Sequence, residues 1–301
     1  MGRGRIADAV KSGRILVADG AWGTALQARG LEGGECPELW NAEHPDLVLE
    51  VAKSYIEAGS NMIETNTFGG NRFKLEYYGL GDRVAELNEA GVRISREAAG
   101  EDNWVIASIG PTGKMTLMGD VTEEDFYNVF KEQAVALESA GADAAVIETM
   151  SALDEALAAV RAVKENTNLE IICTFTYEPT VQGEFKTMMG VSPAEAAVQS
   201  VEAGADIVGA NCGKGYEGMT QIINEIRSVL PDIPVIIQAN AGLPELVDGV
   251  SVFPATPKEM ADQNPYWIDA GVNIIGGCCG TTDKHIREIR KTVDSLTGND
   301  R

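Results

Sequence analysis

Eight short apolar segments recur along the chain and set the expected fold. They are Ile15–Ala18, Met62–Thr65, Val105–Ile109, Ala144–Ile147, Ile171–Phe175, Ile207–Ala210, Val235–Gln238 and Asn273–Gly276. Most are continuous apolar runs and do not alternate with polar residues, which is typical of strands buried on both faces of a parallel sheet. Helical patterns lie between them, and two begin with a capping residue followed by proline, at Ser192-Pro193 and Thr256-Pro257.

A repeated turn between helix and strand indicates repeated βα units. It occurs at Ala58-Gly59-Ser60-Asn61, Ala140-Gly141-Ala142-Asp143, Ala203-Gly204-Ala205-Asp206 and Ala270-Gly271-Val272-Asn273. In each, the glycine can end a helix in a left-handed conformation, and the polar residue can start the next strand. Eight strands alternating with helices predict an α/β protein with a single (β/α)8 TIM barrel. A doubly wound open sheet is the alternative, but no Gly-x-Gly-x-x-Gly motif follows the first predicted strand.

Length and charge narrow the possible functions. The 301 residues, 44% of them hydrophobic, suit one barrel domain over residues 1–301, because such barrels use about 250 residues. A net charge of −22 would repel phosphate backbones, so we expect no nucleic-acid partner. No apolar run approaches the roughly 18 residues of a membrane span. Charges interrupt Ile6–Lys11, which predicts a short surface helix and no signal peptide, so we expect a cytoplasmic protein with no membrane partner.

Three cysteines are expected at one rim of the barrel. Cys212 follows the sixth predicted strand, while Cys278 and Cys279 follow the eighth. Only the seventh strand separates these two, so three thiolates with one open position could form a catalytic Zn2+ site. Adjacent residues of a regular strand face opposite ways, but the glycines flanking the Cys278-Cys279 pair would let the backbone bend.

Other interpretations of these residues remain open at this stage. Cysteine often serves as a small buried apolar residue, and we expect this for Cys173, with Cys36 an incidental loop thiol. A disulfide between the adjacent cysteines would be strained. Barrels also bind phosphate at the corner formed here by Gly280-Thr281-Thr282. A phosphosugar aldolase or isomerase is disfavoured, because no strand end carries a lysine for Schiff-base chemistry.

Three carboxylates end predicted strands at the same rim. Acidic side chains are seldom buried without a partner. Asp19 and Glu148 suit a substrate ammonium group, whereas we expect Glu64 to pair with an arginine or cap a loop. His285 lies one turn into the last predicted helix and is expected on its solvated face.

At these positions the sequence resembles the homocysteine S-methyltransferase family. Four segments carry the resemblance, in order along nearly the whole chain: Asp19-Gly20-Ala21-Trp22-Gly23-Thr24, Glu64-Thr65-Asn66-Thr67-Phe68, Gly209-Ala210-Asn211-Cys212-Gly213 and Gly276-Gly277-Cys278-Cys279-Gly280. A fifth, Ser108-Ile109-Gly110-Pro111-Thr112-Gly113, is more similar to the cobalamin-dependent methionine synthase branch.

The resemblance implies a zinc-dependent methyltransferase that converts homocysteine to methionine. It implies zinc ligands at Cys212, Cys278 and Cys279, amino-group recognition by Asp19 and Glu148, backbone contacts near Gly20 and Ala21, and Asn240 beside the metal. Zinc would lower the pKa of the substrate thiol, whose thiolate is the nucleophile. The alternative functions are one component of a corrinoid system, moving methyl between a small compound and a corrinoid protein, and a zinc-bearing binding barrel without turnover.

The methyl donor is expected to come from outside the chain. The sequence ends at Arg301, soon after the last predicted helix, without the cobalamin module of the methionine synthase branch. We expect methylcobalamin on a separate corrinoid protein ahead of a small sulfonium or ammonium donor. The loops Leu31–Glu35 and Ala239–Pro254 are expected to frame the barrel mouth where a donor would approach.

Overall fold

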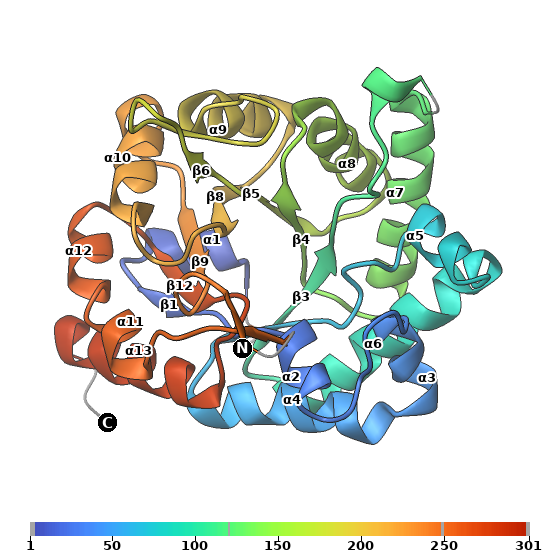
Figure 1. The fold of residues 1–301 in the computed structure, drawn as a ribbon, viewed down its shortest axis with the longest axis horizontal. Helices are drawn as coiled ribbons and strands as arrows, with labels where there is room; N and C mark the ends of the chain where they lie inside the picture. The colour runs from blue at the N-terminus through green and yellow to red at the C-terminus, as the bar shows by residue number, and fades with distance from the viewer. Residues whose placement is uncertain (1–3, 120, 248–249, 299–301) are drawn as a thin grey trace.

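Eight parallel strands form one curled sheet in the computed structural model, which describes residues 4–119, 121–247 and 250–298 (Figure 1). The strand order is β1-β12-β9-β8-β5-β4-β3-β2. The strands are β1 (Leu16–Val17), β2 (Met62–Glu64), β3 (Trp104–Ile109), β4 (Ala144–Met150), β5 (Glu170–Phe175), β8 (Ile207–Cys212), β9 (Val235–Ala239) and β12 (Ile274–Gly277). Each lies in a predicted apolar segment or within a few residues of it.

Asn61 joins the two outermost strands of this order and closes the barrel. Its backbone N–H donates to the Val17 carbonyl at 2.7 Å, and its side-chain oxygen accepts the Val17 N–H at 2.9 Å. Asn61 is the polar residue that the repeated turn places before β2. The predicted (β/α)8 TIM barrel is therefore confirmed, and the doubly wound open sheet is excluded.

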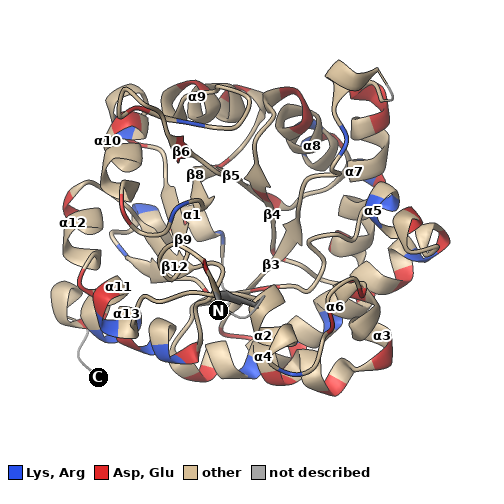
Figure 2. Cartoon of the chain, in the orientation of Figure 1, with Lys and Arg blue, Asp and Glu red and all other residues tan. Residues whose placement is uncertain are grey.

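Helices surround the sheet and carry most of the charged side chains (Figures 1 and 2). They are α2 (Gly23–Gln27), α3 (Trp40–Glu43), α4 (Pro45–Ala58), α5 (Arg72–Tyr77), α6 (Val84–Ala99), α7 (Glu123–Ser139), α8 (Leu153–Asn166), α9 (Pro193–Ala203), α10 (Met219–Val229), α11 (Pro257–Ala261), α12 (Asn264–Asp269) and α13 (Asp283–Thr297), with short 3-10 helices at Pro37–Leu39, Gly81–Arg83 and Thr116–Met118. The predicted caps are confirmed, because Ser192 and Thr256 accept the N–H of Glu195 and Glu259. None of the described helices is both long and apolar enough to span a membrane.

The strands are buried on both faces, as their continuous apolar runs predict. In β9, Ile236 belongs to the cluster that fills the barrel, while its neighbour Ile237 packs in the layer between strands and helices. Consecutive side chains of a strand point to opposite faces, so two apolar layers need two apolar residues in a row.

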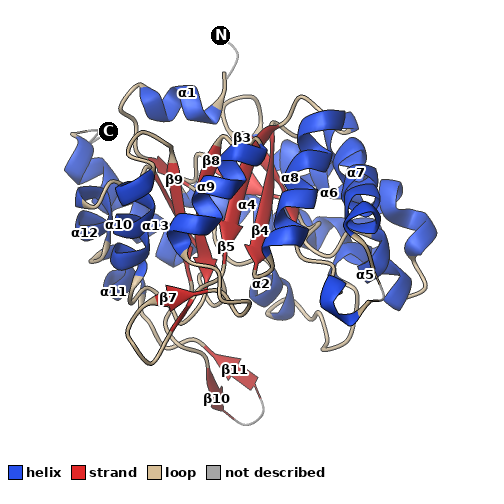
Figure 3. Ribbon diagram, turned by 90° about the horizontal axis from the view of Figure 1, so that it is seen from above, coloured by secondary structure: helices blue, strands red, loops and turns tan. Residues whose placement is uncertain are grey.

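Helix α1 (Ile6–Lys11) closes the N-terminal end of the barrel (Figure 3). Its residues Ile6, Ala7 and Val10 are buried in the barrel's apolar cluster, so the expected surface helix is a plug instead. Glu170 at the start of β5 accepts the N–H groups of Ile6 at 2.6 Å and Ala7 at 2.7 Å.

Two hairpins lie at the opposite end of the barrel (Figure 3). They are β6–β7 (Glu178–Pro179 and Phe185–Lys186) and β10–β11 (Glu245–Val247 and Val250–Val252). The second lies within the loop predicted over Ala239–Pro254, of which residues 248 and 249 lie outside the described residues. The plug therefore leaves the C-terminal ends of the strands as the mouth of the barrel.

We predict that Glu170→Ala lowers the free energy of unfolding by about 1–3 kcal/mol, because two buried N–H groups of α1 lose their acceptor. Urea denaturation of both proteins measures the difference. The control is Glu288→Ala, which removes an exposed pair with Lys291 and should cost less than about 1 kcal/mol. Equal losses of unfolding free energy in the two variants would show that the hydrogen bonds of Glu170 stabilise the fold no more than an exposed ion pair does.

Candidate metal and substrate site

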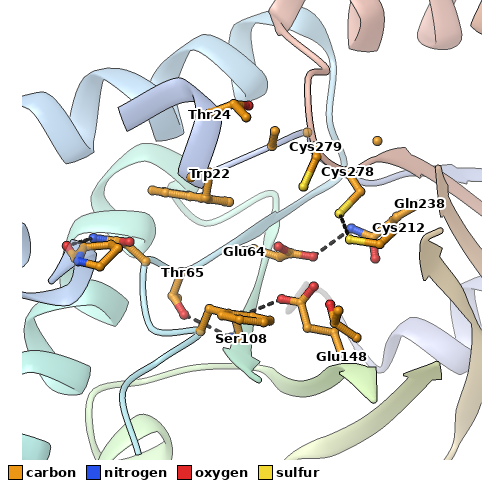
Figure 4. A pocket seen from close by; sticks show the side chains of 18 of the residues that line it. Trp22, Thr24, Glu64, Thr65, Ser108, Glu148, Cys212, Gln238, Cys278 and Cys279 are labelled. Carbon is orange, nitrogen blue, oxygen red and sulfur yellow. Dashed lines mark hydrogen bonds between the residues drawn. The ribbon is translucent and has the colours of Figure 1, made fainter. Parts of the chain in front are cut away.

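The three predicted cysteines come together at the mouth of the barrel (Figure 4). Cys212 ends β8, while Cys278 and Cys279 follow β12. Their sulfur atoms all lie within 4.8 Å of one another, and the Sγ atoms of Cys212 and Cys278 are 2.8 Å apart. The convergence expected from the strand order is therefore present in the fold.

The backbone leaves strand geometry at both cysteine positions. Cys212 has a φ of +58°, and only Thr149 shares such a positive value among the described non-glycine residues. This conformation is unfavourable for most side chains, but it lets Asn211 and Cys212 both reach the cluster. After β12, the Thr281 N–H and hydroxyl both donate to the Cys278 carbonyl, which closes a tight turn. The bend predicted from the flanking glycines therefore exists.

The electrostatics of the cluster favour a bound cation. Hydrogen bonds from Cys212 and Cys278 lower the pKa of Cys279 to about 3. Hydrogen bonds of Cys278 with Cys212 and Cys279, together with burial, raise the pKa of Cys278 well above its usual range. Three anionic sulfurs at this separation would repel one another strongly without a positive ion. A metal that prefers thiolates fits this donor set, and three ligands leave a fourth tetrahedral position open.

A pocket of about 330 Å3 lies beside the cysteines. Its walls are formed by Gly20, Ala21, Trp22, Gly23, Thr24, Pro37, Glu38, Glu64, Thr65, Asn66, Phe68, Ser108, Glu148, Thr149, Cys212, Gln238, Gly277, Cys278 and Cys279. Among these lining residues of the described chain, none is a lysine, arginine or histidine. The pocket can therefore receive cationic groups and offers no side chain that would neutralise its carboxylates.

Glu148 lies on the pocket wall and is held by donors on both carboxylate oxygens. The Ser108 hydroxyl donates to Oε1, and the Asn211 amide donates to Oε2 at 3.2 Å. Burial raises its pKa to about 7, although the Ser108 hydrogen bond opposes this shift. The carboxylate is thus fixed in orientation next to the cysteine cluster.

Asp19 lies directly behind the pocket wall and is completely buried. Its Oδ2 accepts the indole N–H of Trp22 and the backbone N–H of Glu64, each at 2.9 Å. Its Oδ1 is buried without a hydrogen-bond partner among the described residues. Burial raises the pKa of Asp19 to about 7.

The predicted backbone contacts at Gly20 and Ala21 do lie on the pocket wall. The Ala21 N–H donates to the Thr281 hydroxyl at 3.1 Å, and its carbonyl accepts the Tyr55 hydroxyl at 2.6 Å. A Cβ atom at Gly20 would come within 2.8 Å of both Thr281 and Tyr55. Only glycine fits at that point without a shift of these side chains.

Asn240 lies near the cysteines but is not on the pocket wall. Its amide donates to the Gly213 carbonyl at 2.8 Å, so it holds the turn that follows Cys212. Its Oδ1 is buried and has no partner among the described residues.

Two interpretations from the sequence are wrong. Glu64 neither pairs with an arginine nor caps a loop, because it lies on the pocket wall and accepts the Gln238 amide at 2.7 Å. His285 is buried: its Nδ1 accepts the Thr282 N–H, and its Nε2 lies 3.0 Å from the Ala255 carbonyl. By contrast, Cys173 is buried in the core as expected.

No pattern in the sequence indicates that Gln238 is buried or that it lies beside Glu64. Gln238 stands at the end of a predicted strand, but only the folded barrel brings its side chain to Glu64, which lies on a strand that is not its neighbour in the sheet.

Solved structures with this fold include the homocysteine methyltransferase MmuM from Escherichia coli. Its metallated form gives a TM-score of 0.77 at 22% identity, covering 94% of this chain and 98% of that one. Its apo form gives a TM-score of 0.71 at 23% identity, covering 92% and 95%. At this level of sequence identity, the similarity to these structures supports a shared fold alone.

Sequence comparison identifies the family. Methionine synthase of Mycobacterium tuberculosis is 35% identical over 308 residues, which cover 95% of this chain and 25% of that protein. Methionine synthase of Mycobacterium leprae is 35% identical over 301 residues, which cover 93% and 24%. The chain thus spans about a quarter of the length of these relatives. The sequence model of the homocysteine S-methyltransferase family matches residues 16–293, from β1 to the last helix, and the chain belongs to this family.

Proposed function

We propose that the protein is a zinc-dependent methyltransferase that transfers a methyl group to the thiol of homocysteine, giving methionine. The observation that carries this proposal is the gathering of three cysteine sulfurs within 4.8 Å beside a pocket that has buried carboxylates and no basic side chain. Membership of the homocysteine S-methyltransferase family supports methyl transfer as the reaction class.

In this proposal Cys212, Cys278 and Cys279 hold the zinc ion. When bound, Zn2+ supplies Lewis acidity that keeps the substrate sulfur deprotonated and therefore nucleophilic. The chain's own contribution is to fix the three sulfurs and leave one tetrahedral position free for the substrate thiol. Asn240 contributes indirectly, because its bond to the Gly213 carbonyl steadies the turn after Cys212.

The amino-acid end of homocysteine would be recognised by carboxylate and backbone groups of the same pocket. Glu148 presents an oriented carboxylate on the pocket wall, and Asp19 adds a second carboxylate directly behind that wall, with one oxygen left without a partner among the described residues. The backbone near Gly20 and Ala21 would meet the other polar end of the substrate. Binding both ends aligns the sulfur with the incoming methyl group.

The donor in this proposal is methylcobalamin carried by a separate corrinoid protein. Exposed apolar side chains on three loops at the barrel mouth support a protein partner, among them Leu117, Met118, Met188, Leu243 and Leu246. The resemblance of Ser108–Gly113 to the cobalamin-dependent methionine synthase branch motivates this choice of donor. The same surface favours one alternative function, in which the chain moves methyl between a small methylated compound and a corrinoid protein.

We predict that Cys278→Ser loses most bound zinc and nearly all methyl transfer while the barrel stays folded. The physical reason is that serine replaces one of three soft thiolate ligands. Elemental analysis of protein purified without chelator measures the metal, and circular dichroism checks the fold. Cys173→Ala is the matched control, because Cys173 is buried away from the cluster, and it should keep about one zinc per chain. Full zinc retention in Cys278→Ser would contradict the assignment.

We predict that Asp19→Asn and Glu148→Gln each weaken homocysteine binding by about 2–5 kcal/mol, because a buried ammonium loses a charged partner. Zinc content should not change. Isothermal titration of the zinc-loaded variants with homocysteine measures the effect. If both variants bind homocysteine as the unchanged protein does, the two carboxylates are structural.

We predict that, in the presence of homocysteine, the protein demethylates methylcobalamin that is either free or bound to a carrier protein. The cobalamin absorption spectrum follows the reaction directly. Parallel assays use S-methylmethionine and betaine as small donors. Brisk turnover with either of these, and none with any corrinoid, would replace the proposed donor with a small sulfonium or ammonium compound.

A further inference from the structure

Glu64 is a buried carboxylate on the pocket wall to which the function described above gives no role. It ends β2 and has 6% of its surface exposed. Its backbone N–H donates to Asp19, and its Oε1 accepts the Gln238 amide at 2.7 Å. Figure 4 shows the carboxylates of Glu64 and Glu148 pointing toward one another within the pocket. A group placed between them would contact both.

The charges around Glu64 favour a cation that the protein itself does not supply. Glu64 and Glu148 are buried on the pocket wall, Asp19 is buried behind that wall, and no lining residue of the described chain is basic. Like charges in a poorly solvated site destabilise each other unless a positive group lies between them. A metal ion held by the three cysteines would compensate the sulfur atoms. A second cation, which the substrate can bring, would compensate the carboxylates.

The hydrogen-bond acceptors around Glu64 fit an ammonium group. Gln238 lines the pocket and has 2% of its surface exposed, yet its Oε1 has no partner among the described residues. Because its amide N–H already donates to Glu64, Oε1 is left as an acceptor. An ammonium carries three N–H donors and would satisfy such buried acceptors. A neutral group with fewer donors would leave at least one of them unsatisfied, which is costly.

We propose that Glu64, oriented by Gln238, binds the substrate's ammonium together with Glu148 and makes the enzyme selective for amino-acid thiols. The inference rests on the proposed function for the identity of the acceptor. Asp19 supports the arrangement from behind by accepting the Glu64 N–H. Thiols of the same length that lack an amino group would leave the carboxylates uncompensated and bind weakly.

The test compares homocysteine with 4-mercaptobutyrate, which has the same chain and thiol but no amino group. Isothermal titration of zinc-loaded protein gives both affinities without requiring turnover. We expect Glu64→Gln to weaken homocysteine binding about 10- to 100-fold, since a hydrogen bond to a charged group is lost. The affinity for 4-mercaptobutyrate and the zinc content should both stay unchanged. The preference for homocysteine over 4-mercaptobutyrate should therefore fall by the same factor as the affinity for homocysteine.

Two further variants make the outcome decisive. Gln238→Met removes the amide that orients Glu64 and should reduce the preference in the same direction, and it carries the test if Glu64→Gln does not fold. Glu155→Gln is the matched control, because Glu155 is a buried carboxylate outside the pocket that accepts Thr112, and its preference should be unaltered.

An unchanged preference in Glu64→Gln, or equal losses for both thiols, would overturn the inference. The proposed function fails separately, if the unchanged protein does not methylate homocysteine with any donor. A shifted binding preference without methyl transfer would keep the ammonium site and reject the reaction.

Discussion

Closure of eight parallel strands is the constraint on which the rest of this structure depends. In the closed order, β9 lies between β8 and β12, so the ends of those two strands are close neighbours. Sulfur atoms 66 residues apart in the chain therefore meet at 2.8 Å. The meeting also needs a left-handed backbone at Cys212 and a tight turn after Cys278, which regular strands would not provide.

The second constraint is the sign of charge inside the pocket. Three cysteine sulfurs and the carboxylates of Glu64 and Glu148 line the same pocket, and no basic lining residue of the described chain balances them. Cations from outside the chain would stabilise such a site, and the sulfurs and the carboxylates suit different ones. The soft sulfur side suits a metal such as zinc, while the oxygen side suits an ammonium. In the proposed function, one pocket would hold two cationic groups, a metal at the sulfurs and the substrate ammonium at the carboxylates.

The wrong interpretations share one physical cause. The expectations for Glu64 and His285 rest on their own elements alone, a strand end and the first turn of a helix. Their surroundings come from elsewhere in the chain: Gln238 follows Glu64 by 174 residues, and Ala255 precedes His285 by 30. Asp19 shows the same limit, because it does end β1 at the mouth, yet packing places it behind the wall with only one oxygen satisfied.

Local patterns in the sequence determined the strands, the helix starts at Ser192 and Thr256, the barrel and the three converging cysteines. Each of these follows from periodicity, from capping chemistry or from the fixed order of strands in a closed barrel. Only the tertiary structure decided which carboxylates reach the pocket and which partners hold them. Those outcomes depend on register and packing between strands far apart in the sequence. The residue alternation of one strand says which face a side chain takes, and not what lies opposite it.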